Sequence, residues 1–449
     1  MCGAMLARRG IERINWRCWR VDAAGEREAM GQHMQTSRVE QCRLCGGALT
    51  GDVLDLGAQP ISNRLLMPGA PEADRYPLAI VLCRDCGLPQ LSDNLPSSAH
   101  FHDDYVYLSG ASSTWVAHCD AFATRMVEQY ALSPDDLVVE LGSNDGTLLK
   151  AFVARGIQVL GVEPSGNVAQ IARDAGVRTI TAFFNAETAA QVARNFGRPR
   201  LIIANNVLAH VPDTGGFLRA AADLVAVGGA LCFEFPHNSR IINQRYFDTI
   251  YHEHYTYLGV GPLQIWAAAH GMAVVDVVPQ PTHGGSLRLF MARADDHGIT
   301  SDAAARIADA LAVEANVGAV DAWHALGDDL DQWRRDILAR LRRYQADGMT
   351  IAGSAAASKA TVLSNYLGID ASLIACCADA SLLKQGRRIP GTQIPIIDPD
   401  ELRVRRPDVV LVFAWNIFAE IAQQLSDSLP AGTRLICPLP SPVELCLPI

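Results

Sequence analysis

The stretch VVELGSNDGTLLKAF, residues 138–152, decides the fold class of the central part of this chain. An apolar run ends at Glu140, a turn with two glycines follows, and a helix-like segment begins. A second apolar run, IQVLGVEP, ends in Glu163, which lies 21 residues after Gly142. This order of strand, turn, helix, strand and acid predicts a Rossmann-like nucleotide-binding unit.

The spacing of Gly142 and Gly146 favours S-adenosylmethionine as the ligand of this turn. The turn reads E-x-G-x-x-x-G, whereas a dinucleotide site reads G-x-G-x-x-G and places a pyrophosphate on the helix N-terminus. S-adenosylmethionine has no pyrophosphate, and Glu163 can accept hydrogen bonds from both of its ribose hydroxyls. The competing interpretation is a strand, turn and helix of another α/β protein.

Composition excludes several classes of protein. The chain has 449 residues, enough for two or three domains. Its formal net charge of −10 provides no overall basic field for a nucleic-acid backbone. No apolar run approaches the roughly 20 residues of a membrane helix, and residues 1–36 hold no apolar core of a secretion signal. We therefore expect a cytoplasmic protein without nucleic-acid or membrane partners.

Two short cysteine motifs predict a zinc site. CRLCGG begins at Cys42 and CRDCG begins at Cys83. The glycine after each pair permits the positive φ that folds the backbone around a metal. Four thiolates close a tetrahedral site with no open position for water, so the ion should be structural. The predicted ligands are Cys42, Cys45, Cys83 and Cys86. The alternative is a chance or redox CxxC pair.

The order of predicted elements divides the chain into five parts. Seven strands with helices between the early ones, closing in a hairpin around residues 281–286, predict a doubly wound α/β sheet with an antiparallel edge. The predicted parts are a disordered extension (1–36), a zinc-binding domain (37–98), a Rossmann-like class I methyltransferase domain (99–294), a helical connector (295–345) and a second α/β Rossmann-like domain (346–449).

The segment YFDTIYHEHYTY, residues 246–257, is dense in titratable side chains. It follows the predicted strand GALCFEFP, and ligands bind at the carboxyl ends of such strands. Its HEH differs from the zinc-protease pattern HExxH, and an i,i+2 pair is a poor metal fork. A histidine beside a carboxylate and phenols suits proton abstraction and oxyanion stabilisation better. The alternative is a loop of hydrogen-bonded core aromatics.

Several motifs together resemble those of one enzyme family. In order, they are CxxCG…CxxCG, Y-x-Y-x-S, ELGSNDG, GVEPSGNVA, NNVLAHVPD, FDTIYHEHYTYL, HGGSLR and PDVVLVFAWN. Over residues 40–445 the chain looks like the sugar-nucleotide C-methyltransferases that build branched deoxysugars, such as dTDP-deoxysugar 3-C-methyltransferases. The resemblance implies a zinc-binding domain, an S-adenosylmethionine domain and a C-terminal pseudo-Rossmann domain. It also implies a nucleotide-linked keto-sugar substrate, and we expect a monomer or homodimer.

The resemblance carries roles over to individual residues. His254 corresponds to the general base, with Tyr251 and Glu253 as its active-site companions. The other implied catalytic residues are a second histidine, His210, and an N-terminal tyrosine, Tyr105 or Tyr107, with spacing slightly favouring Tyr105. The implied cofactor-binding residues are Glu140, Gly142, Asn144, Gly146, Glu163, Pro164, Asn205 and Asn206.

The chain departs from the family's pattern in the C-terminal domain. The family's loop there reads like G-x-G-A-x-A-K-G, whereas this chain has GSAAASKA, in which Ala355 and Ala360 replace glycines. The extra methyl groups narrow the backbone's approach to any ligand. The role of this domain, which also carries Lys359 of that motif, is therefore open.

In the implied reaction His254 removes a proton from the carbon next to a ketone, and that carbon then takes the methyl group of S-adenosylmethionine. The enolate oxygen needs preorganised donors, each worth about 3–4 kcal/mol. Two alternatives remain. One is an O- or N-methyltransferase of another small molecule, with His254 deprotonating a hydroxyl or amine. The other is a non-catalytic zinc-knuckle binding protein, against which the acidic balance argues.

Overall fold

The computed structural model describes residues 36–95, 108–111, 113–296 and 298–448. All of them belong to one compact unit, Thr36–Ile449. The predicted disordered extension, apart from Thr36, and the candidate residues Tyr105 and Tyr107 lie outside the described residues. Within the described ranges, no helix is long and apolar enough to cross a membrane.

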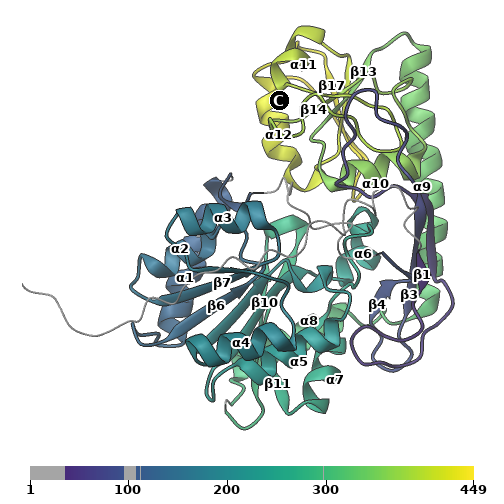
Figure 1. Cartoon of the computed structure of the whole chain (residues 1–449). Coiled ribbons are helices and arrows are strands. Elements are labelled where there is room, and N and C mark those ends of the chain that lie inside the picture. Colours follow the sequence, from purple (N-terminus) through teal and green to yellow (C-terminus); the bar gives the residue numbers. More distant parts are fainter. Residues whose placement is uncertain (1–35, 96–107, 112, 297, 449) are drawn as a thin grey trace, which may run out of the picture. The chain divides into compact units, whose positions relative to one another are not determined.

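Seven strands form the central sheet, drawn in blue and green in Figure 1. They are β6 (Leu137–Leu141), β7 (Gln158–Glu163), β8 (Thr179–Thr181), β9 (Leu201–Asn205), β10 (Ala230–Pro236), β11 (Met272–Gln280) and β12 (Ser286–Arg293). The order is β11-β12-β10-β9-β6-β7-β8, and β12 runs antiparallel to both of its neighbours. The predicted doubly wound sheet and its closing hairpin are therefore confirmed.

Helices cover both faces of this sheet. Val138 of β6 joins one apolar core with Phe152, whereas its neighbour Val139 joins another with Phe217. A strand that is buried on both faces reads as a continuous apolar run, which made this strand detectable in the sequence. The helices on these faces include α1 (Ser113–Gln129), α2 (Thr147–Val153), α3 (Gly166–Asp174), α4 (Ala186–Phe196), α5 (Thr214–Leu224) and α7 (Val260–Ala269). The short helix α6 (Ser239–Gln244) packs in a different apolar core.

The N-terminal part contains a three-stranded antiparallel sheet, with two strands between its cysteine pairs and the third after the second pair. Its strands are β2 (Leu54–Gln59), β3 (Tyr76–Leu82) and β4 (Pro89–Leu91), while β1 (Ser37–Arg38) pairs with β5 (Asp93–Asn94). The second cysteine pair lies between β3 and β4, so the metal site fixes where β4 begins.

Two helices lie in the sequence between the central sheet and the C-terminal sheet. They are α8 (Ser301–Val313) and α9 (Val320–Ala346). The buried residues of α9 recur every three or four positions, which is the period of one helix face. They are Trp323, Leu326, Leu330, Trp333, Ile337, Leu341 and Tyr344.

The C-terminal part is a second α/β sheet with order β15-β14-β13-β16-β17-β18. Its elements are β13 (Ile351–Ser354), α10 (Ser358–Leu367), β14 (Cys377–Ala378), β15 (Ile396–Ile397), α11 (Pro399–Arg405), β16 (Val409–Val412), α12 (Phe418–Ser426), β17 (Arg434–Cys437) and β18 (Val443–Cys446). The antiparallel edge strand β18 was not predicted. Its residues are only partly buried, and four residues among prolines give a weak strand signal.

Candidate functional site

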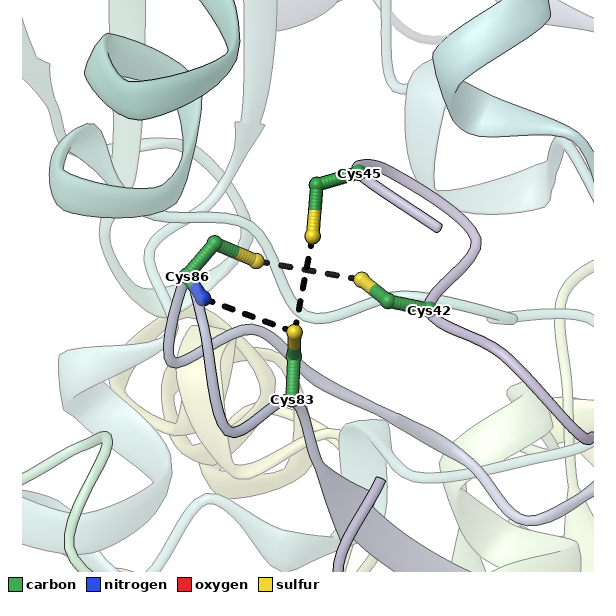
Figure 2. A group of neighbouring side chains, drawn as sticks. All are labelled: Cys42, Cys45, Cys83 and Cys86. Atoms are coloured by element: carbon green, nitrogen blue, oxygen red, sulfur yellow. Dashed lines mark hydrogen bonds between the residues drawn. The ribbon is translucent and has the colours of Figure 1, made fainter. Parts of the chain in front are cut away.

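The four predicted zinc ligands converge, as Figure 2 shows. Their sulfur atoms all lie within 4.8 Å of one another. Cys42 Sγ is 3.7 Å from Cys86 Sγ, and Cys45 Sγ is 3.5 Å from Cys83 Sγ. A tetrahedral zinc ion with Zn–S bonds of about 2.3 Å separates its sulfurs by about 3.8 Å. Both the donor set and the spacing fit one closed structural zinc site.

Each cysteine pair forms the predicted tight knuckle. Gly46 and Gly87 have φ of 75° and 73°. The Gly46 amide donates to the Cys42 carbonyl at 2.9 Å, and the Gly87 amide donates to the Cys83 carbonyl at 3.0 Å. Only glycine adopts this left-handed conformation without strain.

The zinc-binding part also anchors the segment of residues 246–257. The Leu91 amide donates to the Tyr255 carbonyl at 3.0 Å, and the Tyr257 amide donates to the Pro89 carbonyl at 2.9 Å. The guanidinium of Arg43, inside the first knuckle, lies 4.9 Å from the centre of the Tyr255 ring. Zinc ligation therefore helps to place the residues that follow His254.

The predicted cofactor turn has the expected backbone, with Gly142 and Gly146 at φ of 67° and 74°. A Cβ on Gly142 would lie 2.5 Å from Val207 Cγ2, and one on Gly146 would lie 3.0 Å from Val177 Cγ2. The space that these glycines leave is thus filled by protein side chains. Glycine is needed at both positions because of the backbone conformation and this close packing.

Two candidate cofactor residues carry buried oxygens that suit a ligand. Glu140 Oε2 and Asn205 Oδ1 are buried and have no hydrogen-bond partner among the described residues. Burial raises the pKa of Glu140 well above its ordinary value, and the nearby carboxylates Glu163 and Asp145 raise it further. Buried polar atoms normally have partners. The residues at this sheet edge therefore fit S-adenosylmethionine, whose amine and hydroxyls are donors.

Glu163 lies at the tip of β7, as predicted, but backbone amides already occupy its carboxylate. Asn144 N donates to Oε2 at 2.9 Å and Ser165 N donates to Oε1 at 2.8 Å. Glu163 thus joins the turn after β6 to the start of α3. Each carboxylate oxygen can accept more than one hydrogen bond, so a ribose diol remains compatible with this arrangement. The remaining candidates, Pro164 and Asn206, directly follow β7 and β9.

The side chain of His254 is held in one orientation. Its Nδ1 lies 2.8 Å from the Thr249 carbonyl, which can only accept, so Nδ1 carries the proton. Its Nε2 lies 2.8 Å from the Tyr251 hydroxyl, and in the neutral imidazole it accepts a hydrogen bond from that hydroxyl. The neutral imidazole therefore presents its lone pair on Nε2, which is what a general base requires.

His254 lies in a pocket with several polar side chains. Its lining residues are Ala209, Pro236, His237, Arg240, Ile241, Tyr246, Thr249, His254, Thr256, Tyr257 and Gly285. The ring of His210 packs edge-to-face on that of His254, with centroids 4.6 Å apart. Burial lowers the pKa of His210 to about 4, so this neighbour is uncharged at neutral pH.

Glu253 points to the other side of the segment, where it contacts the N-terminal part. Its Oε2 accepts from Asn63 Nδ2 at 2.6 Å, and the Ser358 hydroxyl donates to Asn63 Oδ1 at 2.7 Å. Its Oε1 is buried and has no partner in the described part of the chain. Burial raises the pKa of Glu253 to about 7, against the lowering effect of the Asn63 hydrogen bond.

Sequence reasoning missed three residues near this site. Asn63 lies far upstream in a stretch without a chemical motif, and Arg240 is the second residue of the short helix α6. Thr249 acts through its carbonyl, which no side-chain pattern reveals. The only available signal was the position of Arg240 just after the carboxyl end of β10.

Comparisons with known proteins agree with a methyltransferase that carries a zinc-binding domain. Family models of a zinc binding domain, a methyltransferase domain and a C-methyltransferase C-terminal domain match residues 42–101, 117–277 and 281–440. The chain is 34% identical over 409 residues to C-methyltransferase NovU of Streptomyces niveus, which covers 90% of this chain and 96% of that protein.

Two solved methyltransferases match part of the chain at low similarity. Magnesium protoporphyrin IX methyltransferase of Synechocystis PCC 6803, with bound S-adenosylmethionine, is 17% identical, covers 40% of this chain and 79% of its own, and has a TM-score of 0.31. CcbJ of Streptomyces caelestis is 14% identical, covers 39% and 90%, and also has a TM-score of 0.31. Both matches are too distant to carry further conclusions.

Fold, cysteine site and family models together define an S-adenosylmethionine-dependent methyltransferase with a zinc-binding domain. At 34% identity over nearly the whole length of both proteins, the chain belongs to the C-methyltransferase family that includes NovU.

Proposed function

We propose that the protein methylates the carbon next to the ketone of a nucleotide-linked keto-deoxysugar, with His254 as the general base. The observation that carries this proposal is the orientation of the imidazole. The Thr249 carbonyl holds the proton on Nδ1, so the lone pair of Nε2 lies beside the Tyr251 hydroxyl. A base with a fixed tautomer next to a phenol suits abstraction of a proton next to a carbonyl.

The base alone is too weak for this chemistry, because a carbon acid next to a ketone is far weaker than imidazolium. The enolate oxygen must therefore meet a donor as the proton leaves. The Tyr251 hydroxyl, 2.8 Å from His254 Nε2, is a donor beside the base. One such donor contributes about 3–4 kcal/mol of transition-state stabilisation, and a positioned base contributes about 10²–10⁴-fold.

The proposed step conserves charge and electrons. His254 Nε2 takes the proton, the C–H pair becomes the enolate π bond, and the carbonyl pair moves onto oxygen. S-adenosylmethionine supplies a methyl group made electrophilic by its sulfonium. The enolate carbon forms the new C–C bond while the methyl–sulfur bond breaks and its electron pair stays on sulfur, so S-adenosylhomocysteine leaves. The ketone is restored in the same step, and the imidazolium later releases its proton to solvent.

The position of Arg240 favours a substrate that carries an anionic group. This side chain lines the pocket of His254, and its Nε is buried with no hydrogen-bond partner among the described residues. A Cβ on Gly285 would lie 2.8 Å from that Nε, so a side chain at position 285 would displace the guanidinium from its place in the pocket wall. A guanidinium is well suited to a diphosphate, which favours a nucleotide-linked sugar over an uncharged one.

The proposal is tested by incubating the protein with S-adenosylmethionine and a panel of dTDP-, GDP- and CDP-linked keto-sugars. Mass spectrometry and NMR then locate the transferred methyl group. We expect one panel member to gain a methyl on the carbon next to its ketone. A methyl group on oxygen or nitrogen, or methylation only of compounds without a nucleotide, would overturn the proposal.

A further inference from the structure

A buried cluster joins three motifs that lie far apart in the sequence. Asp248 comes from the segment FDTIYHEHYTYL, Lys359 from GSAAASKA and Trp415 from PDVVLVFAWN. The Trp415 indole N–H donates to Asp248 Oδ2 at 2.5 Å. The Lys359 ammonium lies 4.0 Å from the centre of the Trp415 ring. Trp415 of the C-terminal sheet domain thus bonds the carboxylate of the catalytic segment, and Lys359 of the same domain packs on the Trp415 ring, where its charge acts on Asp248 without a direct hydrogen bond.

Burial makes the members of this cluster depend on one another. Asp248 is 0% exposed and Trp415 is 6% exposed. Burial raises the pKa of Asp248, which the charge of Lys359 and the Trp415 hydrogen bond counteract. Burial also lowers the pKa of Lys359, which the charge of Asp248 counteracts. A buried charge is costly without a partner, so removing one member leaves the others unfavourably placed.

A single turn of the backbone connects this cluster to the candidate base. Asp248 is the middle residue of the 3₁₀ turn Phe247–Thr249, and the carbonyl of Thr249 accepts from His254 Nδ1. The Thr249 hydroxyl donates to the Tyr246 carbonyl at 2.7 Å, which closes the turn on itself. A displacement of Asp248 would therefore move the carbonyl that orients the imidazole.

Trp415 also supports the wall of the pocket. Its ring centroid lies 4.1 Å from that of Tyr246, which lines the pocket beside His254. A Cβ on Gly284 would lie 2.8 Å from the Trp415 ring and 3.2 Å from the Tyr246 ring, so these groups pack without spare room. The indole is thereby held at the angle that its hydrogen bond to Asp248 needs.

We propose that Asp248 is a positioning residue for His254, and that Trp415 and Lys359 of the C-terminal domain set its place. This inference rests on the proposed role of His254 as the base. It gives the C-terminal domain a function in catalysis that does not require its altered loop to bind a nucleotide.

The test compares three variants of the full chain with the wild type. Trp415→Phe removes the indole donor but keeps an aromatic ring beneath Lys359, and Asp248→Asn keeps an acceptor for the indole. Trp323→Phe is the matched control, because Trp323 N–H donates to the Val317 carbonyl in an equally buried place away from the turn. We expect kcat to fall at least tenfold in Trp415→Phe and by a smaller factor in Asp248→Asn. In both variants the KM for S-adenosylmethionine should stay within twofold of wild type. In Trp323→Phe, kcat should not fall.

A second readout follows the imidazole itself, without substrate. In protein carrying ¹⁵N-histidine, the His254 signals are assigned by their loss in His254→Asn. We expect protonated Nδ1 in wild type and in Trp323→Phe, and a mixture of tautomers in Trp415→Phe. An unchanged tautomer together with an unchanged kcat in Trp415→Phe would overturn the inference. If the tautomer shifts while His254→Asn stays fully active, the proposed function fails but the link from Trp415 to the imidazole stands.

Discussion

Asn63 Nδ2 donates to Glu253 Oε2 across 2.6 Å, and this hydrogen bond joins the zinc-binding part of the chain to the residue beside the candidate base. Because Ser358 donates to the other end of the same amide, the orientation of the amide is fixed. One side chain thus connects three separate parts of the sequence at the candidate active site.

We predict that Asn63→Ala raises the pKa of Glu253 above its value of about 7. The hydrogen bond favours the charged carboxylate, so its loss favours the protonated form. In Glu253→Gln, one limb of the pH profile of kcat/KM should disappear, which assigns that limb to Glu253. In Asn63→Ala, the same limb should move to higher pH by about one unit, since one pKa unit corresponds to 1.36 kcal/mol. The measurement is turnover between pH 5 and 9.

Ser358→Ala is the control for this change, since it removes the bond at the far end of Asn63 and leaves the one to Glu253. It should shift the profile less than Asn63→Ala does. The idea fails if Asn63→Ala leaves the limb in place.

We predict one zinc ion per chain, and its loss in Cys83→Ser. That variant should be insoluble or sensitive to protease, because the ligand set supplies folding energy to the N-terminal part. Any soluble fraction should turn over slowly, since β4 holds the Tyr255 and Tyr257 backbone. Metal analysis and limited proteolysis provide the measurement.

Cys446→Ser is the matched control, because Cys446 is exposed and lies outside the metal cluster. It should keep its zinc and its activity. Well-folded wild-type protein without zinc would remove the prediction.

For the cofactor, Glu163→Ala should weaken S-adenosylmethionine binding by roughly tenfold or more. A hydrogen bond to a charged group contributes about 1.5–3 kcal/mol, and 1.4 kcal/mol is a factor of ten in Kd. The variant also frees the Asn144 and Ser165 amides, which loosens the turn that surrounds the ligand. Calorimetry measures the change, with the exposed Glu187→Ala as control. Equal affinity in the two variants would show that Glu163 only ends a strand.

His252 should make the folded state sensitive to acid. It is buried, its Nε2 donates to the Pro77 carbonyl at 3.1 Å, and burial lowers its pKa from 6.5 to about 4. Between these values the unfolded chain binds the proton and the folded chain does not, so stability falls as pH drops from 6.5 to 4. The loss amounts to roughly 3 kcal/mol at 1.36 kcal/mol per unit.

The comparison with His252→Gln isolates this contribution, because glutamine can donate to the same carbonyl but does not titrate. His210 acts in the same direction, with a pKa lowered to about 4, whereas the raised pKa of Glu253 costs stability as pH rises from 4.5 to about 7. Urea unfolding at several pH values should therefore show a flatter acid limb in His252→Gln than in wild type or in the exposed His324→Gln. Identical pH dependence in all three would contradict the prediction.

The sequence predicts most of this fold because its decisive features are local. The run before Glu140, the turn at Gly142 and Gly146, and the two CxxCG pairs each specify geometry within a few residues. The strand Val443–Cys446 was not predicted, because a short and half-exposed edge strand has no sequence pattern as clear as those of the buried strands and glycine turns.

The partners within the site could not be predicted in the same way. Asn63 and Glu253 are 190 residues apart, and Asp248 and Trp415 are 167 apart, so only the tertiary fold brings them together. The motif residues themselves were predictable from the family resemblance, but the bonds that orient them were not. The orientation of His254 depends on a backbone carbonyl, which any residue at position 249 would supply.

The most direct test of the central claim measures deuterium uptake from solvent at the sugar carbon in His254→Asn and His210→Asn. Both variants should bind S-adenosylmethionine and the keto-sugar nucleotide nearly as wild type does. The account predicts that His254→Asn loses exchange and methyl transfer together by about 10²-fold or more, while His210→Asn retains measurable exchange. Near-normal exchange in His254→Asn, with none in His210→Asn, would contradict it and make His210 the base.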